Sequence, residues 1–134
     1  MIQTFTEVFD TLWTELYNHY PSVCLTTDYT KAPATFPAVV IEEKDNYVLT
    51  RTIDSGNNEN HAVVMYEIGV FSNKESGKRS EAWELMGFID TILSKYGWVR
   101  TSCIPVPNYE DNTIYRLVAR YRGTVDKNTN IWRN

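Results

Sequence analysis

The stretch His61-Ala-Val-Val-Met-Tyr-Glu-Ile-Gly-Val-Phe-Ser72 decides the fold class. Its β-branched and aromatic residues favour an extended strand, in which successive side chains point to opposite faces. One face is wholly apolar, whereas the other mixes apolar residues with His61 and Glu67. We therefore expect residues 61–72 to form a central strand with something covering both of its sides. The apolar face consists of Ala62, Val64, Tyr66, Ile68 and Val70.

Helical patterns occur on both sides of this strand. Thr4 and Glu7 have the spacing of a capping box, and Pro21 ends the first helix because a residue before proline avoids helical geometry. A second helix is predicted over about residues 80–96, with Gly97 as its left-handed C-terminal cap. The first helix carries one broad apolar stripe at helical spacing, made of Phe5, Val8, Phe9, Leu12, Trp13, Leu16, Tyr17 and Tyr20.

Further extended segments surround these elements. Residues 22–27 alternate in polarity, and residues 38–42 begin a strand whose pattern continues at 47–52. Between them, Lys44-Asp45-Asn46 is either a turn between two strands or a bulge in one long strand. The last two strands are predicted at 98–104 and 113–122.

The order of elements is helix, three or four strands, helix and two strands. Because strands and helices fall in separate blocks, we expect an α+β fold. It should contain a mostly antiparallel sheet of four to six strands, with two helices packed on one face. A single domain is predicted over residues 1–125, followed by a C-terminal tail at 126–134.

Composition restricts the classes of function. The net charge of −4 argues against a protein whose main task is to hold duplex nucleic acid. The purely apolar runs, such as residues 38–41, are far shorter than the roughly twenty residues of a membrane-spanning helix, so we expect none. Cys24 and Cys103 lack a metal-binding spacing and are expected to be small buried side chains, with a disulfide between them left open.

Residue patterns typical of catalysis are scarce. His19 and His61 are the only histidines, and neither has a second ligand at metal spacing. We therefore expect no catalytic residues, no metal and no cofactor. An enzymatic alternative would rest on His61 acting with Asp54 or Glu59 as an acid–base group.

The clearest candidate for binding is a row of arginines on the last strand. Arg116, Arg120 and Arg122 share one face, which fits carboxylates of a neighbouring subunit or phosphates of a nucleic acid. The alternative is a solvated outer face. Trp83, beside the helical stripe, and Trp132, in the tail, are candidate interface anchors. A candidate mobile contact loop precedes the central strand and contains Asp54, Asn57, Asn58 and Glu59.

Short strings in a fixed order carry a family resemblance. They are Arg51-Thr-Ile-Asp-Ser, Glu59-Asn-His-Ala-Val-Val-Met-Tyr-Glu-Ile, Phe71-Ser-Asn-Lys, Gly77-Lys-Arg-Ser-Glu-Ala, Pro105-Val-Pro-Asn and Ile114-Tyr-Arg-Leu-Val-Ala-Arg-Tyr. In order and number they resemble the tail completion or tail terminator proteins of long-tailed, siphovirus-like phages and prophages. The resemblance spans residues 36–123 and leaves out the first helix and the tail.

The resemblance implies a small structural subunit that assembles into a ring, commonly a hexamer, on the end of the tail tube. Such a ring stops tube polymerisation and joins the tail to the head connector. The implied partners are copies of itself, the tail tube protein and the head connector or neck proteins, with DNA only as cargo through the lumen. The implied location is the virion tail or neck, and the host cytoplasm during assembly.

Two alternatives stay open. One is a minor capsid protein of the neck, which would act as a head–tail connector on the portal side rather than on the tube. The other is a nucleic-acid-associated factor that uses the row of Arg116, Arg120 and Arg122.

Overall fold

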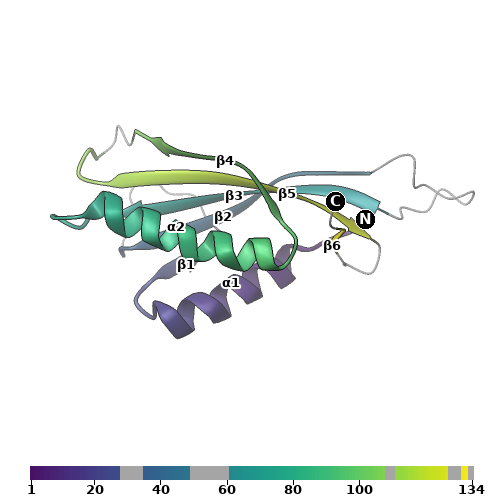
Figure 1. Ribbon diagram of the computed structural model, residues 1–134, viewed down its shortest axis with the longest axis horizontal. Coiled ribbons are helices and arrows are strands. Elements are labelled where there is room, and N and C mark those ends of the chain that lie inside the picture. Colours follow the sequence, from purple (N-terminus) through teal and green to yellow (C-terminus); the bar gives the residue numbers. More distant parts are fainter. Residues whose placement is uncertain (28–34, 49–60, 108–110, 127–130, 133–134) are drawn as a thin grey trace, which may run out of the picture.

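The computed structural model describes residues 1–27, 35–48, 61–107, 111–126 and 131–132 (Figure 1). Within these residues, two helices and six strands follow one another in blocks. They are α1 (Phe5–His19), β1 (Cys24–Thr26), β2 (Ala38–Val48), β3 (His61–Ser72), α2 (Lys78–Lys95), β4 (Val99–Val106), β5 (Tyr115–Asp126) and β6 (Ile131–Trp132).

The strands form one sheet in the order β1-β2-β3-β5-β4, with β6 paired to the end of β5. Only β1 runs parallel to its neighbour β2, and every other pairing is antiparallel. The α+β class and the mostly antiparallel sheet are therefore confirmed. The strand predicted at 61–72 is β3, and it lies at the centre of the sheet. Part of the expected tail, Ile131–Trp132, pairs with Thr124 and Val125 as β6.

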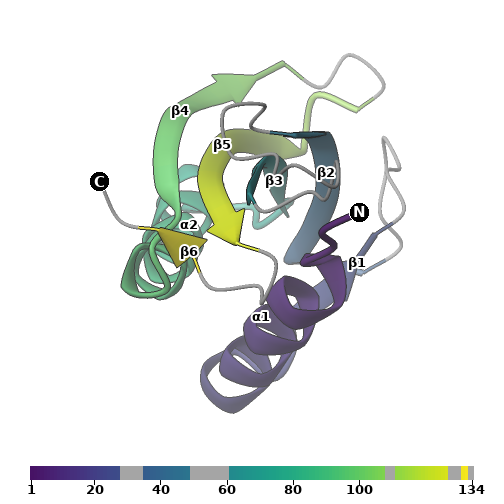
Figure 2. The same ribbon diagram turned by 90° about the vertical axis from the view of Figure 1, so that its right-hand side faces the viewer.

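Both helices cover the same face of the sheet, and α1 and α2 lie side by side beneath it in Figure 2. The main core fills the space between the helices and this face. From α1 it takes Val8, Leu12 and Leu16. The opposite face, called the helix-free face below, holds a second small cluster of Ala38, Val40, Phe71 and Ile114. The two clusters explain why β3 carries apolar residues on both of its faces.

The buried stripe of α1 is narrower than the sequence pattern predicts. Trp13 is 51% exposed and Tyr17 is 59% exposed, so both fall outside the core. Their rings stack on each other, with centroids 5.2 Å apart and an angle of 5° between the ring planes. Helical spacing placed them on the stripe, but the sheet contacts only the part of it that is centred on Leu12.

The predicted capping box at the start of α1 is wrong. Thr4 is the N-cap residue, but its side chain makes no capping hydrogen bond. Its hydroxyl instead shares a 2.7 Å hydrogen bond with the hydroxyl of Tyr66 on β3. Both side chains are buried, and a buried hydroxyl needs a partner. Burial raises the pKa of Tyr66 well above its ordinary value. The Thr4 side chain therefore links α1 to the sheet and does not cap the helix.

The open question about Lys44-Asp45-Asn46 has a clear answer. Strand β2 runs unbroken through this segment, and its register against β3 shifts between Glu43 and Asp45. The segment is therefore a β-bulge, with one extra residue on β2. The side-chain amide of Asn46 donates to the Ile2 carbonyl at 2.8 Å, so the bulge also holds the N-terminal segment.

The second helix begins two residues earlier than predicted, after Gly77, and ends as expected at a left-handed glycine. Gly97 has φ 95°, and the next amide, of Trp98, donates back to the Leu93 carbonyl at 3.0 Å. This arrangement satisfies the last carbonyls of α2. It also delivers Trp98 into the core, where its ring meets Tyr66 edge-on at 5.2 Å.

We predict that Gly123→Ala destabilises the protein. A Cβ at this position in β5 would lie 2.7 Å from Cε3 of the buried Trp98 ring, so the ring or the strand must shift. Overpacking of this kind lowers the free energy of unfolding by about 1–3 kcal/mol, as urea denaturation would measure. The control is Gly87→Ala in α2, where a Cβ meets nothing within 4 Å. That variant should be neutral or more stable by up to about 1 kcal/mol, and equal losses in both would contradict the prediction.

Candidate assembly surfaces

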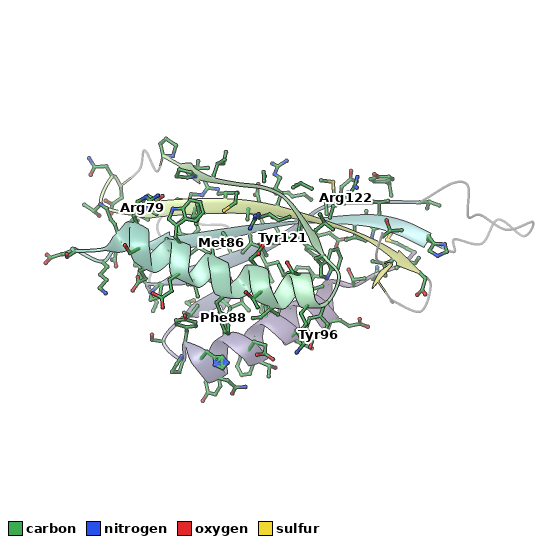
Figure 3. The ribbon with its side chains drawn as sticks, viewed as in Figure 1. Arg79, Met86, Phe88, Tyr96, Tyr121 and Arg122 are labelled. Carbon is green, nitrogen blue, oxygen red and sulfur yellow. The ribbon has the colours of Figure 1, made fainter. Side chains whose placement is uncertain are left out.

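The arginine row lies on one face of the sheet, as predicted. Along β5, Leu117, Ala119 and Tyr121 are fully buried on the helix-covered side. The alternate residues Arg116, Arg120 and Arg122 therefore lie on the helix-free face. In Figure 3, Tyr121 and Arg122 are neighbours on β5 whose side chains leave opposite faces of the sheet.

The three arginines have different surroundings. The guanidinium of Arg116 lies 5.6 Å from the centroid of the Phe71 ring. Arg120 is ion-paired at 3.2 Å with Glu67, whose other carboxylate oxygen is 3.5 Å from Nζ of Lys44. Arg122 is exposed and has no ion-pair partner among the described residues. The row is therefore not a uniform basic stripe, because Glu67 offsets the charge at its middle.

The ion pair of Arg120 is on the surface, where solvent and salt screen the two charges. It contributes less than about 1 kcal/mol to folding, as exposed pairs usually do. Because Arg120 is already paired with Glu67, it is less available than an unpaired arginine to bind a carboxylate or phosphate of a partner. Arg122 is the member of the row that is best placed to meet an external group.

Trp83 is engaged within the chain. Its indole N–H donates to the Tyr115 hydroxyl at 3.0 Å, and the Arg79 guanidinium lies 5.8 Å from the centroid of a Trp83 ring. It is half-buried against the main core and joins α2 to the start of β5. Trp132 lies in β6, but its side chain falls outside the described residues.

The candidate contact loop also falls outside the described residues. This applies to Asp54, Asn57, Asn58 and Glu59, and so to the carboxylates that an enzyme would pair with His61. His61 itself is half-buried at the start of β3, in register with Asp126 of β5.

The cysteines form no disulfide and are only half-buried, so they are more exposed than expected. Cys24 lies on β1 and Cys103 on β4, at opposite edges of the sheet. Burial raises the pKa of Cys103.

A hydrogen-bonded group fixes α2 against the sheet beside β4. The Tyr121 hydroxyl donates to Oδ1 of Asp90 at 2.8 Å, and Nη1 of Arg100 lies 3.1 Å from the same oxygen. Burial, with Asp90 as the acceptor, raises the pKa of Tyr121 far above its ordinary value. Arg100 is thus directed to the helix side of the sheet, which leaves its neighbour Val99 on the helix-free face.

Exposed apolar side chains are the feature that sequence reasoning missed. Val99 is 60% exposed and Ile104 is 58% exposed, and both lie on the helix-free face of β4. On the other layer of the molecule, α1 exposes the stacked Trp13 and Tyr17. The alternation within residues 98–104 gave no signal of this exposure, because the position of β4 at the edge of the sheet follows only from how the strands pair.

Within the described residues, no group of three or more His, Cys, Asp or Glu side chains is placed to hold a metal ion. Neither described helix is long and apolar enough to cross a membrane. The sequence matches no protein-family model, and comparison with curated proteins found no match.

Proposed function

We propose that this chain is a structural subunit of a self-assembling ring. The observation that carries the proposal is the exposure of large apolar side chains on both layers of a small domain. Trp13 and Tyr17 on α1 and Val99 and Ile104 on β4 are each more than half exposed. Ring subunits make head-to-tail contacts and so need two different surfaces, which these two pairs of side chains supply.

Within that class, we propose a tail terminator of a long-tailed phage or prophage. The support is the resemblance of the ordered strings between residues 36 and 123. Most of the described strings fall in the strands β3, β4 and β5 and in α2, so the resemblance concerns several elements of the domain rather than one loop, although it leaves out α1 and β1. The subunit would form a ring on the end of the tail tube, stop its growth and present a surface to the head connector.

Two further candidate functions stay open. A neck or head–tail connector protein would use a similar ring on the portal side. A nucleic-acid-associated factor would use Arg116, Arg120 and Arg122, but the structure favours this less because Glu67 is ion-paired with Arg120 in the middle of the row. Binding to phosphates must weaken steeply as salt rises, so salt-independent or absent DNA binding would contradict that alternative.

Self-association tests the class directly. We expect sedimentation velocity of the purified protein to show a species several times the 15.6 kDa monomer, either alone or after addition of tail tube protein. Negative-stain images of that species should show rings. A monomer that persists at high concentration and with tail tube protein present would contradict the proposed function.

A further inference from the structure

The helix α1 presents an acidic, aromatic surface. Residues 1–27 contain three carboxylates and neither lysine nor arginine. Asp10 is exposed and lies one turn before Trp13, which stacks on the equally exposed Tyr17 one turn later. At this spacing the three side chains follow one flank of the helix. We call Asp10, Trp13 and Tyr17 the α1 patch.

The helix-free face of β4 and β5 has the opposite charge. Residues 99–106 and 115–122 contain no aspartate or glutamate, and three of their four arginines, Arg116, Arg120 and Arg122, lie on this face, whereas Arg100 lies on the helix side. Arg122 stands opposite Val99 in the pairing of β4 with β5, and Ile104 lies further along the same face of β4. All three are exposed. We call Val99, Ile104 and Arg122 the sheet patch.

The two patches belong to opposite layers of one molecule. Figures 1 and 2 both place α1 below the sheet, and the sheet patch lies on the helix-free face of that sheet, at its β4 edge. The sheet separates the α1 patch from the sheet patch, so the two complementary surfaces of one chain do not meet. A contact between them requires a second copy.

We infer that the α1 patch of one copy docks on the sheet patch of the next. This inference rests on the proposed function and names the two surfaces that close the ring. In this contact the Asp10 carboxylate faces the Arg122 guanidinium. The guanidinium can also pack on the aromatic faces of Trp13 and Tyr17, which attract cations. Val99 and Ile104 supply apolar area for the same rings. Because the surfaces differ, the contact is head-to-tail and repeats until the ring closes.

Charge reversal at each patch tests the pairing. Asp10→Arg and Arg122→Asp should each raise the dissociation constant for self-association at least about tenfold, since like charges then face each other. The double variant places arginine on α1 and aspartate on the sheet, and it should restore assembly. An equimolar mixture of the two single variants should also assemble, because a head-to-tail order that alternates them pairs opposite charges at every contact. Identical patches facing each other would already bring like charges together in the unaltered chain, so reversing the charge of one patch would not create the repulsion on which this test depends.

Controls separate this pairing from general effects of charge. Glu75→Arg and Lys74→Asp change the net charge by the same amounts at exposed positions before α2, and they should assemble like the unaltered chain. Trp13→Ala with Tyr17→Ala should weaken assembly, whereas the thermal melt of the monomer, measured at a concentration too low for assembly, should change little, since exposed substitutions rarely change stability by more than about 0.5 kcal/mol.

The outcomes distinguish two failures. If the unaltered chain assembles and both single reversals assemble equally well, the assignment of these patches is overturned while the ring proposal stands. Loss of assembly in the single variants without rescue in either the double variant or the mixture would overturn it as well. If the unaltered chain stays monomeric with and without tail tube protein, the proposed function itself is overturned.

Discussion

Phe71→Ala is expected to lower the free energy of unfolding by about 3–5 kcal/mol, the usual loss for a fully buried phenylalanine. Phe71 is 0% exposed and lies on the helix-free face, where neither helix contributes cover. Its ring lies close to Gly69, where an added Cβ would be 3.3 Å from Cε1 of Phe71. The Arg116 guanidinium lies over the same ring. Removing the ring leaves a cavity that rigid sheet backbone cannot fill.

Urea denaturation with matched controls measures this effect. Phe71→Leu keeps most of the volume and should cost less than about 1.5 kcal/mol. Val99→Ala, on the same face but exposed, should change stability by less than about 0.5 kcal/mol. A loss in Phe71→Ala no larger than that in Val99→Ala would show that the helix-free face has no packed centre. The expected loss is a large fraction of the total stability of an ordinary domain.

The central parts of the fold followed from sequence periodicity. The alternation along residues 61–72, with one apolar and one mixed face, predicts a central strand covered on both sides, and β3 lies at the centre of the sheet with a buried cluster on each face. The alternation along 113–122 likewise places Leu117, Ala119 and Tyr121 on the buried face of β5, although Val118 is buried on the opposite face as well. Gly97 predicts the end of α2, because left-handed backbone favours glycine. These features depend on near neighbours in the chain.

The errors arise where distant residues decide the outcome. The Thr4 hydroxyl does not cap α1 because it is hydrogen-bonded to Tyr66, a residue 62 positions away that no local motif reveals. Trp13 and Tyr17 fit the helical stripe, but the width of the buried face depends on how the sheet contacts α1. The spacing of Lys44-Asp45-Asn46 fits either a turn or a bulge, and only pairing with β3 decides between them.

The candidate surfaces were predictable in part. Strand periodicity placed Arg116, Arg120 and Arg122 on one face, but it did not predict the ion pair of Arg120 with Glu67 on the neighbouring strand. That pair reduces the basic row to one exposed and unpaired position among the described residues, Arg122. The exposure of Val99 and Ile104 was not predictable, because it depends on β4 being the edge of the sheet.

The second large effect concerns tail length. A tail tube grows by head-to-tail addition, which leaves a free end after every step and has no intrinsic stopping point. A ring bound to that end would block the surface that receives the next subunit. A phage or prophage lacking this chain should therefore make tails of broadly distributed length, many far longer than normal and none joined to heads. Supplying the unaltered chain in trans should restore one sharp length.

Electron micrographs of particles from such a deletion, with tail lengths measured one by one, test the central claim most directly. Overlong, unattached tails are the result predicted for a terminator. Detached tails of normal length would contradict it and would instead indicate a head–tail connector, whereas intact particles would exclude both roles.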